Sequence, residues 1–186
     1  NILDWLFLPK YGAGLQHLKV EVGGEINSTD GTEPTHARSR EELDNPRREY
    51  FERGYEWWLM KEARKRNPKI ILDCLPWGAP GWIGSGNYCS QDMADYLVGF
   101  IRGARQFHDL DIGLVGCWNE KEVTPDWIKL FRRTLDTNGL AHVNIWVART
   151  FTENHRLRSQ SQRRPALRLL HVLMSVARRR KIHGAP

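Results

Sequence analysis

Short apolar runs alternate with segments of helical periodicity between residues 16 and 147. The apolar runs, which we predict to be strands, cover residues 18–22, 70–75, 112–117 and 143–147. Each is a run of the buried type, bounded by Gly, Pro, Asp or Asn. This order is typical of βαβ units, in which parallel strands form a sheet and the intervening helices pack against it. The sequence therefore predicts an α/β fold.

Three helices are predicted between these strands, and the last has the clearest ends. Thr124 is suited to cap its N-terminus, Pro125 to occupy its first turn, and Asn138-Gly139 to end it. Apolar residues at helical spacing define the predicted buried face of each helix. These faces are Tyr55, Trp58, Leu59 and Ala63; Met93, Tyr96, Leu97, Phe100, Ile101 and Ala104; and Trp127, Leu130, Phe131 and Leu135.

Three strand–helix units and a fourth strand are too few to close a (β/α)8 barrel, which needs about 250 residues. We therefore predict a partial (β/α)8 TIM barrel over residues 1–148, with about half of the barrel present. A small doubly wound sheet is the alternative. Its nucleotide-binding form would need a G-x-G-x-x-G run after a strand, whereas Gly12-Ala13-Gly14 precedes one.

The net charge of +6 is concentrated at the C-terminus. From residue 150 onward there are eight arginines and one lysine against one acid, whereas residues 1–149 hold 19 basic and 21 acidic residues, a balance of −2. We interpret residues 149–186 as an Arg-rich tail outside the barrel. This tail is either non-native, or a native segment that is disordered or helical. The alternative is a basic amphipathic helix over residues 166–180 that binds nucleic acid or an anionic membrane.

Cysteine spacing and hydropathy argue against several classes of protein. Cys74, Cys89 and Cys117 form no C-x-x-C pair, so no zinc ribbon or redox motif is predicted. No run approaches the roughly 18 apolar residues of a membrane span. We expect neither a metal nor a cofactor.

The residues that follow each strand are the candidates for chemistry, because a (β/α)8 barrel places its active site at the carboxyl ends of its strands. Trp118-Asn119-Glu120 follows the third predicted strand. A carboxyl group partly desolvated by a neighbouring tryptophan favours its protonated form, which suits a general acid. Glu120 is therefore the candidate acid, and Glu122 is the rival carboxylate in the following loop.

Other polar and aromatic residues near the strand ends have weaker claims. Asn119 could hold a sugar 2-hydroxyl, and Trp77 could either stack under a pyranose ring or fill the top of the barrel. Single residues such as Tyr11, His17 and His36 have no partner at metal-ligand spacing and are expected to be structural.

Four motifs in order closely resemble the galactocerebrosidase family of glycosidases. They are KVEVGGEINSTDGTEPTH (19–36), GYEWWLMKEARKRNP (54–68), LPWGAPGW (75–82) and HDLDIGLVGCWNE (108–120). The resemblance implies a retaining enzyme that removes galactose from galactosylceramide and galactosylsphingosine in the lysosome, with lipid supplied by a saposin-type protein. It also implies that Glu120 is the general acid/base and that Thr29, Trp77 and Asn119 hold the galactose.

The family places its nucleophilic glutamate on the seventh strand, beyond the region of resemblance. This sequence has no counterpart to that residue, so we expect the 186 residues alone to be inactive. Two alternatives stay open: a non-catalytic homologue that binds a glycolipid, and a protein that binds an anionic partner through its basic tail. Under the main interpretation no nucleic-acid partner is expected.

Overall fold

The computed structural model describes residues 1–28 and 31–147, with no account of the side chains of residues 27, 28 and 31. The predicted tail, residues 149–186, lies outside the described residues, and so does Thr29. The elements, in chain order, are α1 (Ile2–Phe7), β1 (His17–Val22), β2 (Asn27–Ser28), β3 (Gly31–Thr32), α2 (Arg40–Asp44), the 3-10 helix η1 (Arg48–Glu52), α3 (Glu56–Arg66), β4 (Ile71–Pro76), the 3-10 helix η2 (Ile83–Gly86), α4 (Gln91–His108), β5 (Ile112–Gly116), α5 (Pro125–Thr137) and β6 (Asn144–Trp146).

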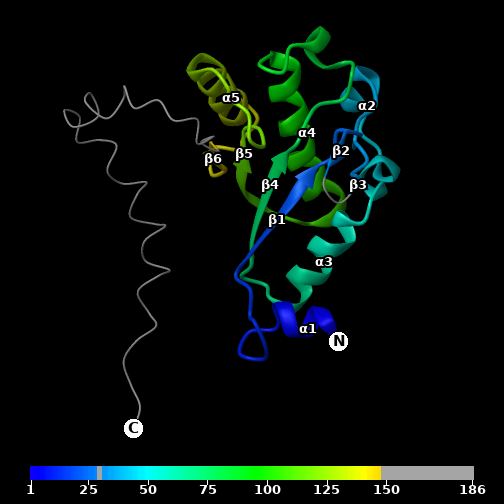
Figure 1. The fold of residues 1–186 in the computed structure, drawn as a ribbon, viewed down its shortest axis with the longest axis vertical. Helices are drawn as coiled ribbons and strands as arrows, with labels where there is room; N and C mark the ends of the chain where they lie inside the picture. The colour runs from blue at the N-terminus through cyan, green and yellow to red at the C-terminus, as the bar shows by residue number, and fades with distance from the viewer. Residues whose placement is uncertain (29–30, 148–186) are drawn as a thin grey trace, which may run out of the picture. The chain divides into compact units, whose positions relative to one another are not determined.

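Four parallel strands form one sheet in the order β1-β4-β5-β6 (Figure 1). All four predicted strands are present, each within two residues of its predicted ends. The pairing of β1 with β4 is regular, whereas that of β4 with β5 shifts by one residue after Leu72. Among the described residues, β1 and β6 each pair on one side only. A parallel sheet that alternates with helices confirms the predicted α/β fold and partial barrel.

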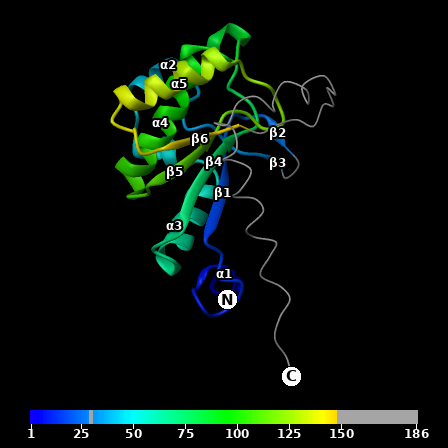
Figure 2. The ribbon, with the colours of Figure 1, turned by 90° about the vertical axis from the view of Figure 1, so that its left-hand side faces the viewer.

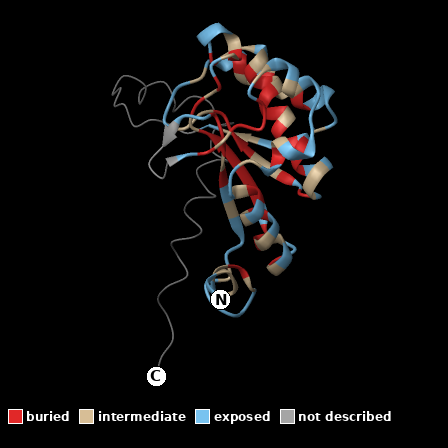
Figure 3. Ribbon diagram, turned by 90° about the vertical axis from the view of Figure 1, so that its right-hand side faces the viewer, coloured by how far each residue is buried: buried red, intermediate tan, exposed pale blue. Residues whose placement is uncertain are grey.

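The helices α3, α4 and α5 lie along one face of this sheet (Figure 2). Strand residues such as Val20, Leu72 and Val115 are buried against them. Figure 3 shows the buried residues concentrated in the strands and on the sheet-facing sides of the helices. The hydrophobic core therefore lies between the sheet and its helical layer.

The predicted helices are all present, but one of them buries a different face from the one expected. All six residues predicted to be buried on α4 are buried. Helix α3, in contrast, buries Trp57, Met60 and Ala63, whereas Tyr55 and Trp58 are more than half exposed. The predicted face of α3 was therefore wrong at Tyr55 and Trp58, whereas Ala63 is buried as predicted. Two adjacent tryptophans fit either of two overlapping helical stripes, and only packing on the sheet selects one.

Helix α5 begins and ends as its sequence indicates. Thr124 is its N-cap, where the Thr124 hydroxyl oxygen accepts a hydrogen bond from the Trp127 amide at 3.2 Å. Pro125 occupies the first turn, and Asn138 caps the C-terminus. The helix is oriented by burial of Trp127, Phe131 and Leu135.

None of the helices in residues 1–28 and 31–147 is both long and apolar enough to cross a membrane.

Candidate active site

The loops that follow β4 and β5 bring two of the sequence-predicted site segments together. The backbone amide of Asn119 donates a hydrogen bond to the Pro76 carbonyl at 2.9 Å. The Trp118 indole N–H donates to the Trp77 carbonyl at 3.1 Å. Trp77 and Asn119 therefore lie on neighbouring, mutually bonded segments at the carboxyl end of the sheet, where a (β/α)8 barrel places its active site.

Trp118 is fixed by a second contact, with Tyr88 in the loop before α4. The two rings stack with centroids 3.7 Å apart and an interplanar angle of 6°. The Tyr88 hydroxyl donates a hydrogen bond to the Cys117 carbonyl, and burial raises the pKa of Tyr88 well above its ordinary value. A neutral, buried phenol therefore anchors the segment that leads to Glu120.

Glu120 follows this anchored segment with a left-handed backbone, φ 52°. Such a conformation is uncommon for a residue other than glycine and is frequent at functional sites. The Glu120 side chain is exposed, so the expectation that a neighbouring tryptophan would partly bury its carboxyl group was wrong. The Trp118 ring stacks on Tyr88 instead. The rival carboxylate, Glu122, is exposed as well.

Thr29 lies outside the described residues, but the base of its loop is well defined. The Glu25 amide donates to the Glu33 carbonyl at 3.2 Å, which closes the loop at its foot. The loop also packs against the segment after Trp77: a Cβ on Gly24 would lie 2.9 Å from the Gly78 carbonyl oxygen. Only a glycine permits this approach, so Gly24, at the foot of this loop, is held beside the segment that follows Trp77.

A cluster of three glutamates at the end of β1, which the sequence analysis missed, also borders this loop. The Glu21 backbone amide donates a hydrogen bond to a Glu56 carboxylate oxygen at 2.7 Å. The Glu56 backbone amide in turn donates a hydrogen bond to the Glu33 carboxylate. Burial and the charge of Glu21 raise the pKa of Glu33 to about 7. Burial and the charge of Glu33 raise the pKa of Glu56 to about 8. The residues are far apart in sequence, so no local pattern identifies this cluster.

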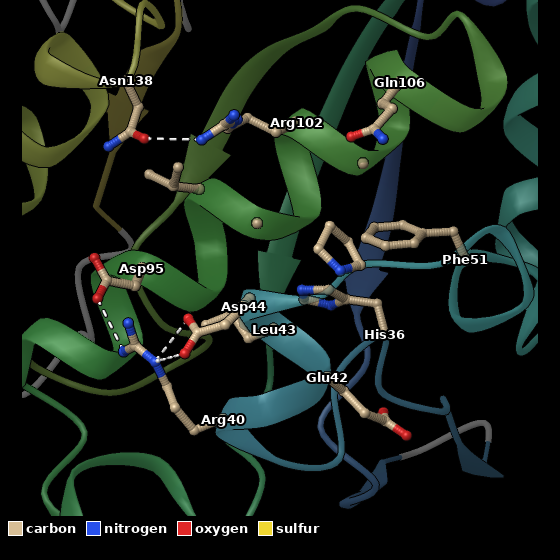
Figure 4. Close-up of a pocket in the computed structure, with 14 residues that line it drawn as sticks. His36, Arg40, Glu42, Leu43, Asp44, Phe51, Asp95, Arg102, Gln106 and Asn138 are labelled. Carbon is tan, nitrogen blue, oxygen red and sulfur yellow. Dashed lines mark hydrogen bonds and ion pairs between the residues drawn. The ribbon is translucent and has the colours of Figure 1, made fainter.

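A separate cavity of about 330 Å³ lies on the helical side of the molecule (Figure 4). Its lining comes from the segment 36–51, from α4 and from Asn138, and includes none of Thr29, Trp77, Asn119 and Glu120. Burial lowers the pKa of His36 to about 3, so this ring is neutral, and it packs on Tyr96 with centroids 4.3 Å apart. Arg40 is already paired with Asp44 and Asp95. This cavity is therefore distinct from the site at the strand ends.

Comparison with known proteins gives the family. A model of "Glycosyl hydrolase family 59" matches residues 1–170. The chain belongs to this family. Over 149 residues it is 50% identical to the galactocerebrosidases of Salmo salar and Homo sapiens and 52% identical to that of Mus musculus. These matches cover 78% of this chain but only 21–22% of each relative, so the chain spans about a fifth of the length of the family members it matches.

Solved structures with a similar fold agree with the partial barrel. The endo-β1,6-glucanase BT3312 superposes with a TM-score of 0.60 at 19% identity, and SrfJ from Salmonella typhimurium with a TM-score of 0.62 at 16% identity. Each superposition covers 78% of this chain and 37–38% of the solved structure. At this level of identity the similarity establishes the fold alone.

Proposed function

We propose that this chain carries the acid/base half of a retaining glycosidase site that removes galactose from galactosylceramide and galactosylsphingosine. The observation that carries the proposal is the joining of the Trp77 and Asn119-Glu120 segments at neighbouring strand ends, in a chain half identical to galactocerebrosidases. Trp77 would stack under the pyranose ring, and Asn119 and Thr29 would bind its hydroxyl groups. Family membership supports hydrolysis of a glycoside, whereas the choice of sugar and lipid belongs to the proposal.

In the proposed mechanism Glu120 acts twice. It first protonates the glycosidic oxygen of the leaving ceramide, and it then removes a proton from the water that hydrolyses the glycosyl-enzyme. The first step needs a second carboxylate about 5–5.5 Å away to attack the sugar carbon. From the family resemblance we expect that carboxylate to lie outside the matched region. We therefore expect the 186 residues alone to bind a galactoside without turning it over.

The acidic lysosome is the proposed site of action, and the glutamate cluster favours it. Glu33 and Glu56, whose pKa values are about 7 and about 8, are protonated and free of mutual repulsion at acidic pH. The loop that carries Thr29 would then be held most firmly under acidic conditions. A saposin-type protein would present the lipid, a part of the proposal that rests on family membership.

A chimera tests the catalytic assignment. The matching 149 residues of the Salmo salar relative would be replaced by those of this chain, and hydrolysis of β-galactosides would be measured with and without Glu120→Gln. We expect the substitution to lower turnover by about 10²- to 10⁴-fold for an alkyl galactoside and much less for an aryl galactoside with a good leaving group. Azide should restore turnover of the aryl substrate, because it attacks the glycosyl-enzyme without needing a general base.

The matched control is Glu122→Gln, which changes an exposed carboxylate two residues away and should leave turnover unchanged. Equal activity of the Glu120→Gln and unaltered chimeras would rule out the acid/base role. Binding of galactoside by a folded but inactive chimera would favour a non-catalytic homologue. Salt-dependent binding of the 186-residue chain to nucleic acid or anionic vesicles, lost on deletion of residues 150–186, would favour a role for the tail.

A further inference from the structure

The face of the sheet opposite the helices carries a polar network that the proposed mechanism does not use. Side chains alternate between the faces of a strand, so the burial of Val20 and Val22 against the helices turns Lys19 to the opposite face. Lys19 pairs in register with Asp73 of β4, which places both side chains on that face. In a (β/α)8 barrel this is the inner face, above which the substrate lies.

Two tryptophans from different elements converge on Lys19. Its ammonium lies 6.0 Å from the ring centroid of Trp77, which follows β4, and 5.5 Å from that of Trp146, in β6. Both distances are within the range of cation–π contact. No carboxylate in residues 1–28 and 31–147 forms an ion pair with Lys19, and both oxygens of Asp73 are engaged elsewhere. Within this described part of the chain, the three hydrogen-bond donors of the ammonium are thus available beside the predicted sugar platform.

Trp146 is held in place by Asp73 and by a glycine. The Trp146 indole N–H donates to Asp73 Oδ1 at 2.8 Å, and His17 Nε2 lies 3.1 Å from Asp73 Oδ2. The Asp73 side chain is only 4% exposed, so the direction of the indole is closely constrained. The ring lies over Gly116 of β5, where an added Cβ would come within 2.8 Å of Trp146 Cζ2.

We propose that Lys19 is a further substrate-binding residue that donates hydrogen bonds to sugar hydroxyl groups, and that Trp146, Asp73 and His17 position it. This inference rests on the proposed galactoside site, because it takes Trp77 as the sugar platform. Sugar hydroxyls are neutral acceptors, and indole rings offer flat apolar faces for the pyranose. His17 was expected to be merely structural, and Asp73 could have been noticed in the sequence as an acid inside a buried apolar run.

The test is titration of the full 186-residue chain with methyl β-galactoside, followed through the NMR signals of the tryptophan indole N–H groups. Lys19→Met keeps the apolar stem and removes the donors, and it should raise the Kd about 10- to 100-fold, the loss expected for a hydrogen bond to a charged group. Lys19→Arg retains the charge and donors and should recover much of the affinity. Asp73→Asn should shift the Trp146 indole signal and weaken binding less.

Lys69→Met is the matched control, because it removes an exposed lysine from the turn before β4 and should leave the Kd unchanged. Loss of binding in Trp77→Ala with an unchanged Kd in Lys19→Met would overturn the role of Lys19 and leave the proposed site intact. Failure of the unaltered chain to bind the galactoside would overturn both proposals. Equal weakening by Lys19→Met and Lys19→Arg would also count against hydrogen bonding, since the arginine keeps the donors.

Discussion

Replacing Glu56 with glutamine should reduce the dependence of this domain's stability on pH. Glu33 is 8% exposed and Glu56 is half-buried. Besides burial, the charge of Glu21 raises the pKa of Glu33, and the charge of Glu33 raises the pKa of Glu56. Their folded-state values, about 7 and about 8, lie above the ordinary value of 4.5. The folded state therefore binds these protons more tightly than the unfolded state does. The resulting stability is complete below pH 4.5 and is lost as the pH rises through 7 to 8.

The magnitude follows from the two shifts. Each pKa unit corresponds to about 1.4 kcal/mol, so the shift of Glu56 alone would amount to about 5 kcal/mol and that of Glu33 to about 3 kcal/mol. The two figures are not simply summed, because the charge of Glu33 contributes to the pKa of Glu56 and the two titrations are therefore coupled. We expect a loss of about 3–5 kcal/mol between pH 4.5 and pH 8, or roughly 10 °C in Tm for a domain of this size.

Glutamine at position 56 keeps an oxygen that can accept the Glu21 amide, but it removes the charge. Glu56→Gln should therefore be about 2–4 kcal/mol more stable than the unaltered chain at pH 8, with a difference of less than about 1 kcal/mol at pH 4.5. Urea denaturation followed by tryptophan fluorescence at several pH values between 4.5 and 8 measures both. Glu122→Gln, an exposed control, should leave the slope unchanged. A pH profile of Glu56→Gln parallel to that of the unaltered chain would refute the reasoning.

Two further substitutions test local features of the fold by urea denaturation at a fixed pH. Thr124→Ala removes the oxygen that caps the Trp127 amide and should cost about 1 kcal/mol, whereas Thr124→Ser should cost much less; equal losses would show that the cap contributes nothing. Gly103→Ala should cost about 1–3 kcal/mol, because its Cβ would lie 1.9 Å from Phe51 Cε1. Gly81→Ala, with nothing within 4 Å of its Cβ, is the control, and an equal effect of the two would contradict the packing argument.

Much of the candidate site could be located from the sequence because its residues directly follow apolar runs. Trp77 and Asn119-Glu120 come at the ends of β4 and β5, so recognising the strands was enough to place these segments at one edge of the sheet. The exposure of Glu120 could not be inferred in this way. Trp118, which we expected to cover the Glu120 carboxyl group, stacks instead on Tyr88, a residue thirty positions earlier in the sequence.

The sequence by itself determined the order of strands and helices, the parallel α/β class and the ends of α5, because these depend on periodicity and capping within one segment. The tertiary structure alone decided which face of α3 is buried, the glutamate cluster around Glu56, and the contacts that join Lys19, Asp73 and Trp146. Each of these joins residues more than thirty positions apart in sequence or depends on packing between elements. Burial, charge repulsion and hydrogen bonding depend on the distance between residues in space. The local pattern of a sequence does not encode that distance.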